Sequence, residues 1–112
     1  MTTYRENPYI VTRTGDGDVT LKLPRTMGNW QIKVLPIDAE GDPSAATGTA
    51  TVEIKSDAVS DFEPLYDGET ALSIDLSQPD SKTFDARVHE IKVTVADLAT
   101  ATGVRVIVHA GE

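Results

Sequence analysis

The sequence of 112 residues contains no cysteine. Disulfide bonds, thiolate metal sites and thiol catalysis are therefore excluded. Small secreted domains are often stapled by disulfides, so this absence favours assembly in a reducing cytoplasm. Aromatic residues make up only 5% of the chain, so a hydrophobic core has to be built mainly from valine, isoleucine, leucine and alanine.

Long apolar runs are missing as well. No stretch approaches the roughly 20 residues that a membrane helix requires, and residues 1–6 lack the apolar region of a signal peptide. We therefore expect no membrane partner. The net charge of −8 argues against nucleic acid as a partner, because phosphate binding needs a clustered positive face.

The charge is unevenly distributed along the chain. Residues 1–37 carry five basic and three acidic side chains, whereas residues 38–112 carry five basic and fifteen acidic ones. An acidic, hydrated surface that keeps the protein soluble explains this pattern. The alternative hypothesis is a functional polarity, in which the N-terminal third docks on a partner and the acidic remainder faces solvent.

What the sequence does contain is alternation, because seven segments place an apolar residue at every second position. These segments are Val19–Leu23, Trp30–Val34, Ala50–Ile54, Leu72–Leu76, Phe84–Val88, Ile91–Val95 and Val104–Val108. Successive side chains of a strand point to opposite faces, so each segment predicts a strand with one dry side. The length fits one domain. We predict an all-β fold, an antiparallel β-sandwich (jelly-roll or Ig-like) of about seven to eight strands over residues 15–112, preceded by an N-terminal arm, residues 1–14.

Several local features refine this prediction. Pro24 is expected to end the strand that begins at Val19. A parity change within residues 30–37 predicts a bulge, burial on both faces or an edge position around Pro36.

Turns and corners are expected in the second half of the chain. A second parity change at His89–Glu90 predicts a bulge or corner, and Asp67–Gly68 predicts a hairpin turn. Residues 97–101 are interpreted as one helical turn or a loop.

The arm predicts a contact surface, because tyrosine and arginine are the residue types that anchor interfaces. The candidate partner-contact residues are Tyr4, Arg5, Tyr9, Arg13 and Arg25. Under this hypothesis the arm orders on a neighbouring subunit. The alternative is a frayed leader or an ordinary first strand at residues 9–12.

No combination of residues indicates catalysis. The two histidines, His89 and His109, fall opposite the apolar parity and lack metal-ligand spacing, so both are expected at the surface. Trp30 shares the parity of Ile32 and is expected in the core, whereas an exposed Trp30 would indicate a sugar platform or an interface. We predict no catalytic residue, no cofactor and no metal, and hence no enzyme.

Acidic loops are the remaining candidate sites. Asp38, Glu40 and Asp42 cluster in one loop, and Asp16 and Asp18 flank a glycine. Calcium prefers several oxygens converging from a loop, but the EF-hand pattern is not met. The interpretation of these loops stays open between hydrated surface and calcium site.

The order of segments also resembles a known group of proteins. The segments are Phe62–Gly68, Leu72–Pro79, Ile91–Val95 and Gly103–Val108. Together they resemble the small virion proteins of tailed bacteriophages, most of all the β-sandwich decoration proteins, also called cement or staple proteins. The resemblance covers roughly residues 28–110 and rests on strand order and turn residues.

This resemblance implies a structural protein without catalytic residues, made in the host cytoplasm and placed on the capsid exterior. It implies binding to the major capsid protein, or to another virion protein, at subunit junctions, which stabilises the shell. Whether the protein forms a homo-oligomer (dimer or trimer) on the particle stays open. Two alternatives also stay open: a tail, neck or fibre-associated virion component, and an Ig-like carbohydrate- or calcium-binding module.

Overall fold

The computed structural model describes residues 9–57 and 59–110. These residues form eleven strands and no helix, and so include no helix long and apolar enough to cross a membrane. One sheet, sheet A, contains β1 (Tyr9–Thr14), β3 (Trp30–Ile37), β9 (Lys82–Phe84) and β11 (Gly103–Ala110). Sheet B contains β2 (Gly17–Met27), β4 (Thr47–Lys55), β5 (Glu63–Pro64), β8 (Ser73–Asp75) and β10 (Val88–Ala99). The last two strands, β6 (Tyr66–Asp67) and β7 (Thr70–Ala71), form a small hairpin.

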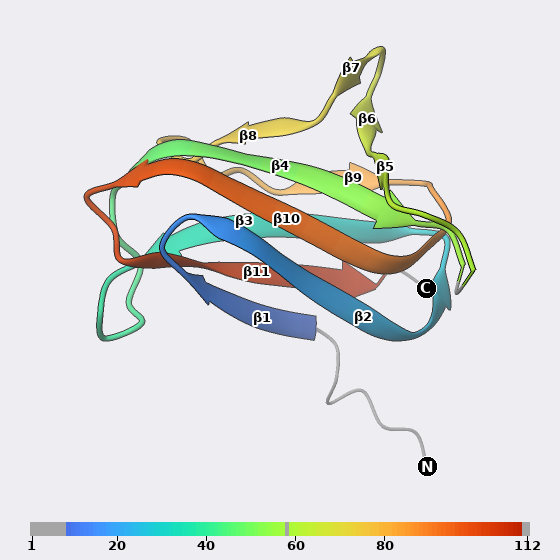
Figure 1. Cartoon of the computed structure of the whole chain (residues 1–112), viewed down its shortest axis with the longest axis horizontal. Coiled ribbons are helices and arrows are strands. Elements are labelled where there is room, and N and C mark those ends of the chain that lie inside the picture. The colour runs from blue at the N-terminus through green and yellow to red at the C-terminus, as the bar shows by residue number, and fades with distance from the viewer. Residues whose placement is uncertain (1–8, 58, 111–112) are drawn as a thin grey trace.

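The two sheets lie face to face (Figure 1). The strand order is β1-β11-β3-β9 in sheet A and β2-β10-β4-β5 in sheet B, where β8 also pairs with β4. Every pairing is antiparallel. The shortest dimension is 22 Å, which suits two sheets about 10 Å apart with side chains on both outer faces. The predicted antiparallel β-sandwich is therefore confirmed. The described residues form eleven strands rather than the predicted seven to eight, and Phe84–Val88 is not one strand, because residues 85–87 separate β9 from β10.

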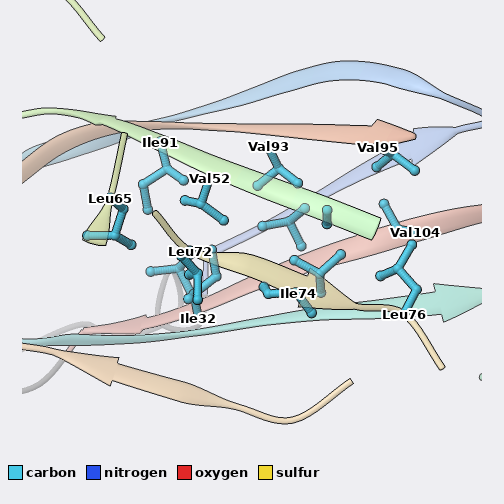
Figure 2. Close-up of a cluster of buried hydrophobic side chains, with 14 of the residues drawn as sticks. Ile32, Val52, Leu65, Leu72, Ile74, Leu76, Ile91, Val93, Val95 and Val104 are labelled. Atoms are coloured by element: carbon cyan, nitrogen blue, oxygen red, sulfur yellow. The ribbon is translucent and has the colours of Figure 1, made fainter. Parts of the chain in front are cut away.

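The core fills the space between the sheets (Figure 2). Strand β10 contributes Ile91, Val93 and Val95 from sheet B, and β11 contributes Val104, Val106 and Val108 from sheet A. The described residues include no buried polar or charged side chain. Apart from Ala86, the alternating apolar residues all pack in this one interior, and the residues between them form two separate outer faces.

The sandwich begins earlier than residue 15. Residues 9–14 form β1, which pairs with β11 from Tyr9 opposite Val108 to Thr14 opposite Gly103. Tyr9 and Val11 pack against the core, so the alternation extends into the segment expected to be an arm. The boundary therefore moves to residue 9, and residues 1–8 lie outside the described part of the chain.

Pro24 does not end its strand, contrary to the prediction. Strand β2 continues to Met27. Its register against β10 shifts, because Met27 lies opposite Val88 and Lys22 lies opposite Glu90. Residues 23–26 of β2 therefore face the single residue His89 of β10, which confirms the bulge predicted at His89–Glu90. Pro24 is tolerated because β2 is an edge strand and the proline lies in the irregular stretch.

The parity change near Pro36 has a different cause from a bulge. The register of β3 against β11 is continuous from Trp30 to Ile37. On the other side, β9 pairs only with residues 30–32, and the Pro36 carbonyl accepts a hydrogen bond of 3.0 Å from the Ser44 N–H of the following loop. Consecutive residues Pro36 and Ile37 are both buried, so the expected edge position and the expected burial on both faces are both confirmed. Ile37 is buried at the end of the strand.

Residues 97–101 contain no helical turn, so that alternative is wrong, whereas the loop alternative holds for residues 100–101, which follow β10. Strand β10 continues to Ala99, and its register against β4 shifts between Ala96 and Ala99. Strand β10 has one residue more than β4 in this stretch, and Asp97, which lies within it, has a φ of 58°. A Cβ on Gly48 would lie 2.8 Å from the carbonyl oxygen of Asp97, so only glycine fits beneath this irregular stretch.

Trp30 lies in the core, as predicted. Its side chain is 1% exposed, its Nε1 donates a hydrogen bond of 2.8 Å to the carbonyl of Ala86, and its ring centroid lies 5.2 Å from that of Phe84. The indole therefore ties the β9–β10 connection to β3 and is no platform for a ligand.

Removing this side chain should destabilise the fold. We expect Trp30→Ala to lower the free energy of unfolding by about 3–5 kcal/mol, and Trp30→Phe to lower it by about 1–3 kcal/mol because the Ala86 carbonyl loses its donor. Urea unfolding followed by circular dichroism measures both, and the exposed Tyr66→Ala serves as control, within about 0.5 kcal/mol. Equal stability of Trp30→Ala and the wild type would contradict this assignment.

Candidate functional site

A polar hollow of about 280 Å³ lies where the outer face of sheet A meets the β3–β4 loop. Thr12 and Thr14 come from β1, Arg105 comes from β11, Thr102 precedes β11, and the other wall is the loop residues 38–41. Because threonine and arginine alternate with core residues on these strands, their side chains point outward. We call this hollow the Arg105 pocket.

The loop wall of the Arg105 pocket is ordered by its own hydrogen bonds. Oδ1 of Asp38 accepts hydrogen bonds of 3.0 Å from the backbone N–H groups of Glu40 and Asp42. The N–H of Gly41 donates to the carbonyl of Asp38 at 3.0 Å, and Gly41 has a φ of 86°, a left-handed conformation that favours glycine. The loop is therefore a preformed wall and needs no ligand to fold.

Arg105 joins this loop to the sheet. Its Nη2 donates a hydrogen bond of 2.8 Å to the carbonyl of Gly41. Among the described residues no carboxylate lies within ion-pair distance of the guanidinium. A guanidinium has five N–H donors, so Arg105 keeps donors for a ligand in the pocket.

The residue types that line the Arg105 pocket can recognise hydroxyl groups. Three threonine hydroxyls, the exposed Glu40 carboxylate and the guanidinium supply both donors and acceptors. Neither of the two histidines is among its lining residues. The arrangement is suited to binding a small polar molecule.

A second concavity, which we call the β8 groove, lies along the other side of the molecule. It consists of two hollows of about 200 Å³ each that share Ser73 and Lys82. One hollow extends to Asp67 of the β6–β7 hairpin, and the other extends to Asp75 and Asp80. The hairpin stands away from the sandwich beside this groove (Figure 1).

Of the predicted contact residues, the structure describes the side chains of Tyr9 and Arg13, which both belong to β1. Tyr9 is half-buried against the core, and Arg13 donates hydrogen bonds to the backbone carbonyls of Asp16 and Asp18 in its own turn. Tyr4, Arg5 and the side chain of Arg25 lie outside the described part of the structure. The structure thus assigns Arg13 a structural contact and leaves the partner role of these residues a prediction.

The acidic loops use their carboxylates for folding. Besides Asp38, Oδ1 of Asp16 accepts a hydrogen bond of 2.9 Å from the N–H of Leu98, and Oδ1 of Asp18 accepts one of 2.8 Å from the Thr94 hydroxyl. Within residues 9–57 and 59–110 no three histidine, cysteine or acidic side chains gather in an arrangement suited to a metal ion. The histidines lie on different sheets, with His89 on β10 and the exposed His109 on β11.

The two outer faces of the sandwich differ in how their charges are paired. On sheet B, Lys92 lies 3.1 Å from Glu53 and Lys55 lies 3.8 Å from Glu90. Both lysine Nζ atoms also lie over the ring of Phe62, at 4.8 and 5.3 Å from its centroid. This face satisfies its own charges across neighbouring strands.

The outer face of sheet A has no such pairs among the described residues. Its central row consists of Ile10, Ile107 and Lys33 on β1, β11 and β3, and the next row includes Arg105 and the half-buried Leu35. Ile10 is 52% exposed. The face therefore combines aliphatic side chains with two cations and carries no carboxylate on its outward strand positions.

Sequence reasoning missed the Arg105 pocket. Its parts come from residues 12–14, 37–41 and 102–105, which only the pairing of β1, β11 and β3 brings together. One local signal was present, because the Asp-x-x-Gly-Asp pattern of residues 38–42 is typical of a turn closed by an aspartate side chain.

Comparison with known proteins shows the fold alone. No protein-family model matches the sequence, and no curated protein matches it. Among solved structures, the chain is similar to the CBM32 of AlyQ in complex with 4,5-unsaturated mannuronic acid, with a TM-score of 0.57 and 15% identity over 92% of this chain and 78% of that chain. That neighbour is a β-sandwich from a carbohydrate-binding module, which agrees with the architecture found here.

Two turn aspartates should shape the acid stability of the protein. The Ser77 hydroxyl and backbone N–H lower the pKa of Asp75, and the Ser60 hydroxyl and the Val59 N–H lower the pKa of Asp57. A carboxyl group whose pKa is lower in the folded state than in the unfolded state stabilises the fold at pH values above its unfolded pKa of about 3.9. This contribution is lost as the pH falls through the folded pKa.

We therefore expect the urea midpoint of the wild type to fall more steeply between about pH 5 and about pH 2 than that of Asp57→Asn/Asp75→Asn. Asparagine keeps an acceptor oxygen for the turn bonds but does not titrate. Parallel pH profiles of the two proteins would contradict the assigned cause.

Proposed function

We propose that this protein is a non-catalytic binding module that holds a sugar ring in the Arg105 pocket. The observation that carries the proposal is the polar hollow itself, which is lined by Arg105 and three threonines beside a loop ordered by hydrogen bonds. Sugars present several hydroxyl groups that both donate and accept hydrogen bonds, and this lining offers both kinds of partner.

The size and lining of the pocket set its expected selectivity. Its volume of about 280 Å³ lies just below the usual range of ligand cavities, roughly 300–1,000 Å³, which favours one ring over a longer chain. No aromatic side chain lines it, so binding depends on hydrogen bonds, and we expect a Kd on the order of 1 mM. The fold supports this class of ligand, since the similar solved module holds a sugar acid.

Substitution of the arginine tests this function. We expect Arg105→Ala to weaken sugar binding at least about tenfold, since charged hydrogen bonds contribute about 1.5–3 kcal/mol each. Titration of a panel of neutral monosaccharides, uronic acids and alginate fragments, followed by ¹H–¹⁵N NMR, measures the effect. Lys33→Ala, a cation on the same face outside the pocket, is the matched control and should bind normally.

The result that would contradict this function is equally specific. If no sugar of the panel shifts the amide signals of Thr12, Thr102 or Gly41, the pocket is not a carbohydrate site. Equal loss in Arg105→Ala and Lys33→Ala would instead indicate a general effect of charge.

The outer face of sheet A favours a second candidate function, a decoration protein on a bacteriophage head. Ile10 is exposed beside Ile107 and Lys33, and the two cations of the face are unpaired among the described residues. A rigid, inert sandwich with one such face suits docking on a shell, where the same contact is repeated many times. The order of segments that resembles decoration proteins supports the same role.

This second function predicts the effect of an outward charge on β1. We expect Ile10→Asp to reduce occupancy on purified phage heads at least about tenfold, because it places a carboxylate within the aliphatic row. Thr20→Asp, an exposed outward position on β2 of sheet B, should leave occupancy unchanged. Density on the heads, compared by cryo-electron microscopy at matched concentrations, measures both; absence of wild-type density would reject the function itself.

A further inference from the structure

The tip of the β6–β7 hairpin carries an Asp–Gly pair, Asp67–Gly68. Asp67 pairs with Thr70, so Gly68 and Glu69 form the turn, and the hairpin predicted at Asp67–Gly68 is confirmed. Gly68 has a φ of 71°, a left-handed conformation that glycine adopts without strain. Apart from its chain neighbours, no atom of the described residues lies within 4 Å of the position that a Cβ on Gly68 would take. The turn therefore has room to change its shape.

An aspartate that precedes glycine can rearrange without an enzyme. The backbone nitrogen of Gly68 attacks Cγ of Asp67, and the hydroxyl of the neutral carboxyl group leaves as water with the amide proton. Water then opens the resulting five-membered succinimide. Attack on Cγ restores aspartate, whereas attack on the main-chain carbonyl carbon breaks its bond to the Gly68 nitrogen and leaves isoaspartate. Glycine favours ring closure because it has no Cβ to obstruct the attack.

The structure leaves the Asp67 side chain free to turn toward this nitrogen. Its carboxylate is 56% exposed and lies 3.6 Å from Nζ of Lys82, which is itself 45% exposed. Exposed ion pairs of this kind restrain their partners weakly. Strands β6 and β7 form a two-stranded sheet of their own, which stands away from the sandwich (Figure 1). Because such small hairpins are marginally stable, this one can open for ring closure while the sandwich stays folded.

The other Asp–Gly pair of the chain, Asp16–Gly17, has the opposite environment. Oδ1 of Asp16 accepts a hydrogen bond of 2.9 Å from the N–H of Leu98, and its carbonyl accepts one from Arg13. Gly17 begins β2 and lies opposite Val95 of β10, and a Cβ on it would lie 2.8 Å from Cζ of Arg13. Ring closure at Asp16 therefore requires these contacts to open first, and this local opening costs free energy.

We propose that Asp67–Gly68 is a site of spontaneous isoaspartate formation in the folded protein and that Asp16–Gly17 is protected. An acidic residue, Glu69 or Asp18, follows each pair, so the local sequence gives the two pairs similar chemistry and the fold separates them. Neither pair lines the Arg105 pocket, so the modification is independent of that pocket's ligand.

Isomerisation at this site would alter the β8 groove. Asp67, Thr70 and Lys82 line one of its hollows. In isoaspartate the free carboxylate is bonded directly to Cα, so its reach is one methylene shorter, and the main chain is one atom longer. We therefore expect the ion pair with Lys82 to be lost and the hairpin end of the groove to change shape.

Incubation of the full-length chain at mildly acidic to neutral pH tests the proposal. Peptide mass spectrometry with electron-transfer fragmentation distinguishes isoaspartate from aspartate and measures the rate at each position. We expect isoaspartate to accumulate at Asp67 at least about tenfold faster than at Asp16. In urea, where the fold holds neither turn, the two rates should agree within about threefold.

Two variants separate the parts of the argument. Asp67→Glu keeps a carboxylate at this position but would need a six-membered ring, so the modification there should disappear. Arg13→Ala removes the donors to the Asp16 carbonyl and should raise the Asp16 rate at least about threefold, provided that circular dichroism shows an intact fold. In aged wild type, but not in aged Asp67→Glu, we expect new amide signals for Ser73 and Lys82, with Gly41 of the Arg105 pocket unchanged.

Several outcomes would overturn the proposal. Absence of isoaspartate at Asp67 in the folded chain, or comparable rates at Asp67 and Asp16, would do so directly. A tenfold difference that persists in urea would show that the sequence alone separates the two pairs. An unchanged Asp16 rate in folded Arg13→Ala would contradict the assigned protection, and unchanged Ser73 and Lys82 signals in the isomerised protein would contradict the effect on the groove.

Discussion

The dry contact between the two sheets is the interaction on which the rest of the structure depends. With Trp30 as its one large aromatic member, this core is built from aliphatic side chains of medium size, and the described residues leave no buried polar group within it. Aliphatic contacts are not directional, so direction and register have to come from elsewhere. They come from the alternation itself, because a slip of one residue would turn a whole strand's apolar set to solvent.

This constraint also explains which parts of the fold were visible in the sequence. Strands β10 and β11 alternate over most of their length, and their existence, the bulge at His89 and the position of Trp30 follow from parity. Pro24 was misleading because a proline is tolerated within a strand that lies at a sheet edge. Whether β2 lies at an edge depends on its pairing with β10, whose residues are more than sixty positions away in the sequence. Asp97 was misleading because aspartate both caps helices and tolerates a positive φ.

The candidate sites were harder to predict for the same physical reason. The Arg105 pocket needs threonines of β1 to lie beside an arginine of β11, and that proximity is a property of strand order. In sequence, Thr12, Thr14 and Arg105 look like ordinary outward positions of alternating strands. The β8 groove is harder still, since it forms where β8 of sheet B lies beside β9 of sheet A, and no local sequence pattern encodes that proximity.

The outer face of sheet A and the Arg105 pocket are physically linked. Arg105 lines the pocket and belongs to the row of outward side chains beside Ile107 and Leu35. A protein surface placed on this face would cover the mouth of the pocket, because Thr12 on the neighbouring strand lies opposite Arg105 and lines the same hollow. Sugar binding and docking through sheet A are therefore mutually exclusive on one copy.

The β8 groove escapes this competition. It lies at the β9 edge, with two strands of sheet A between that edge and β1, and its lining shares no residue with the Arg105 pocket.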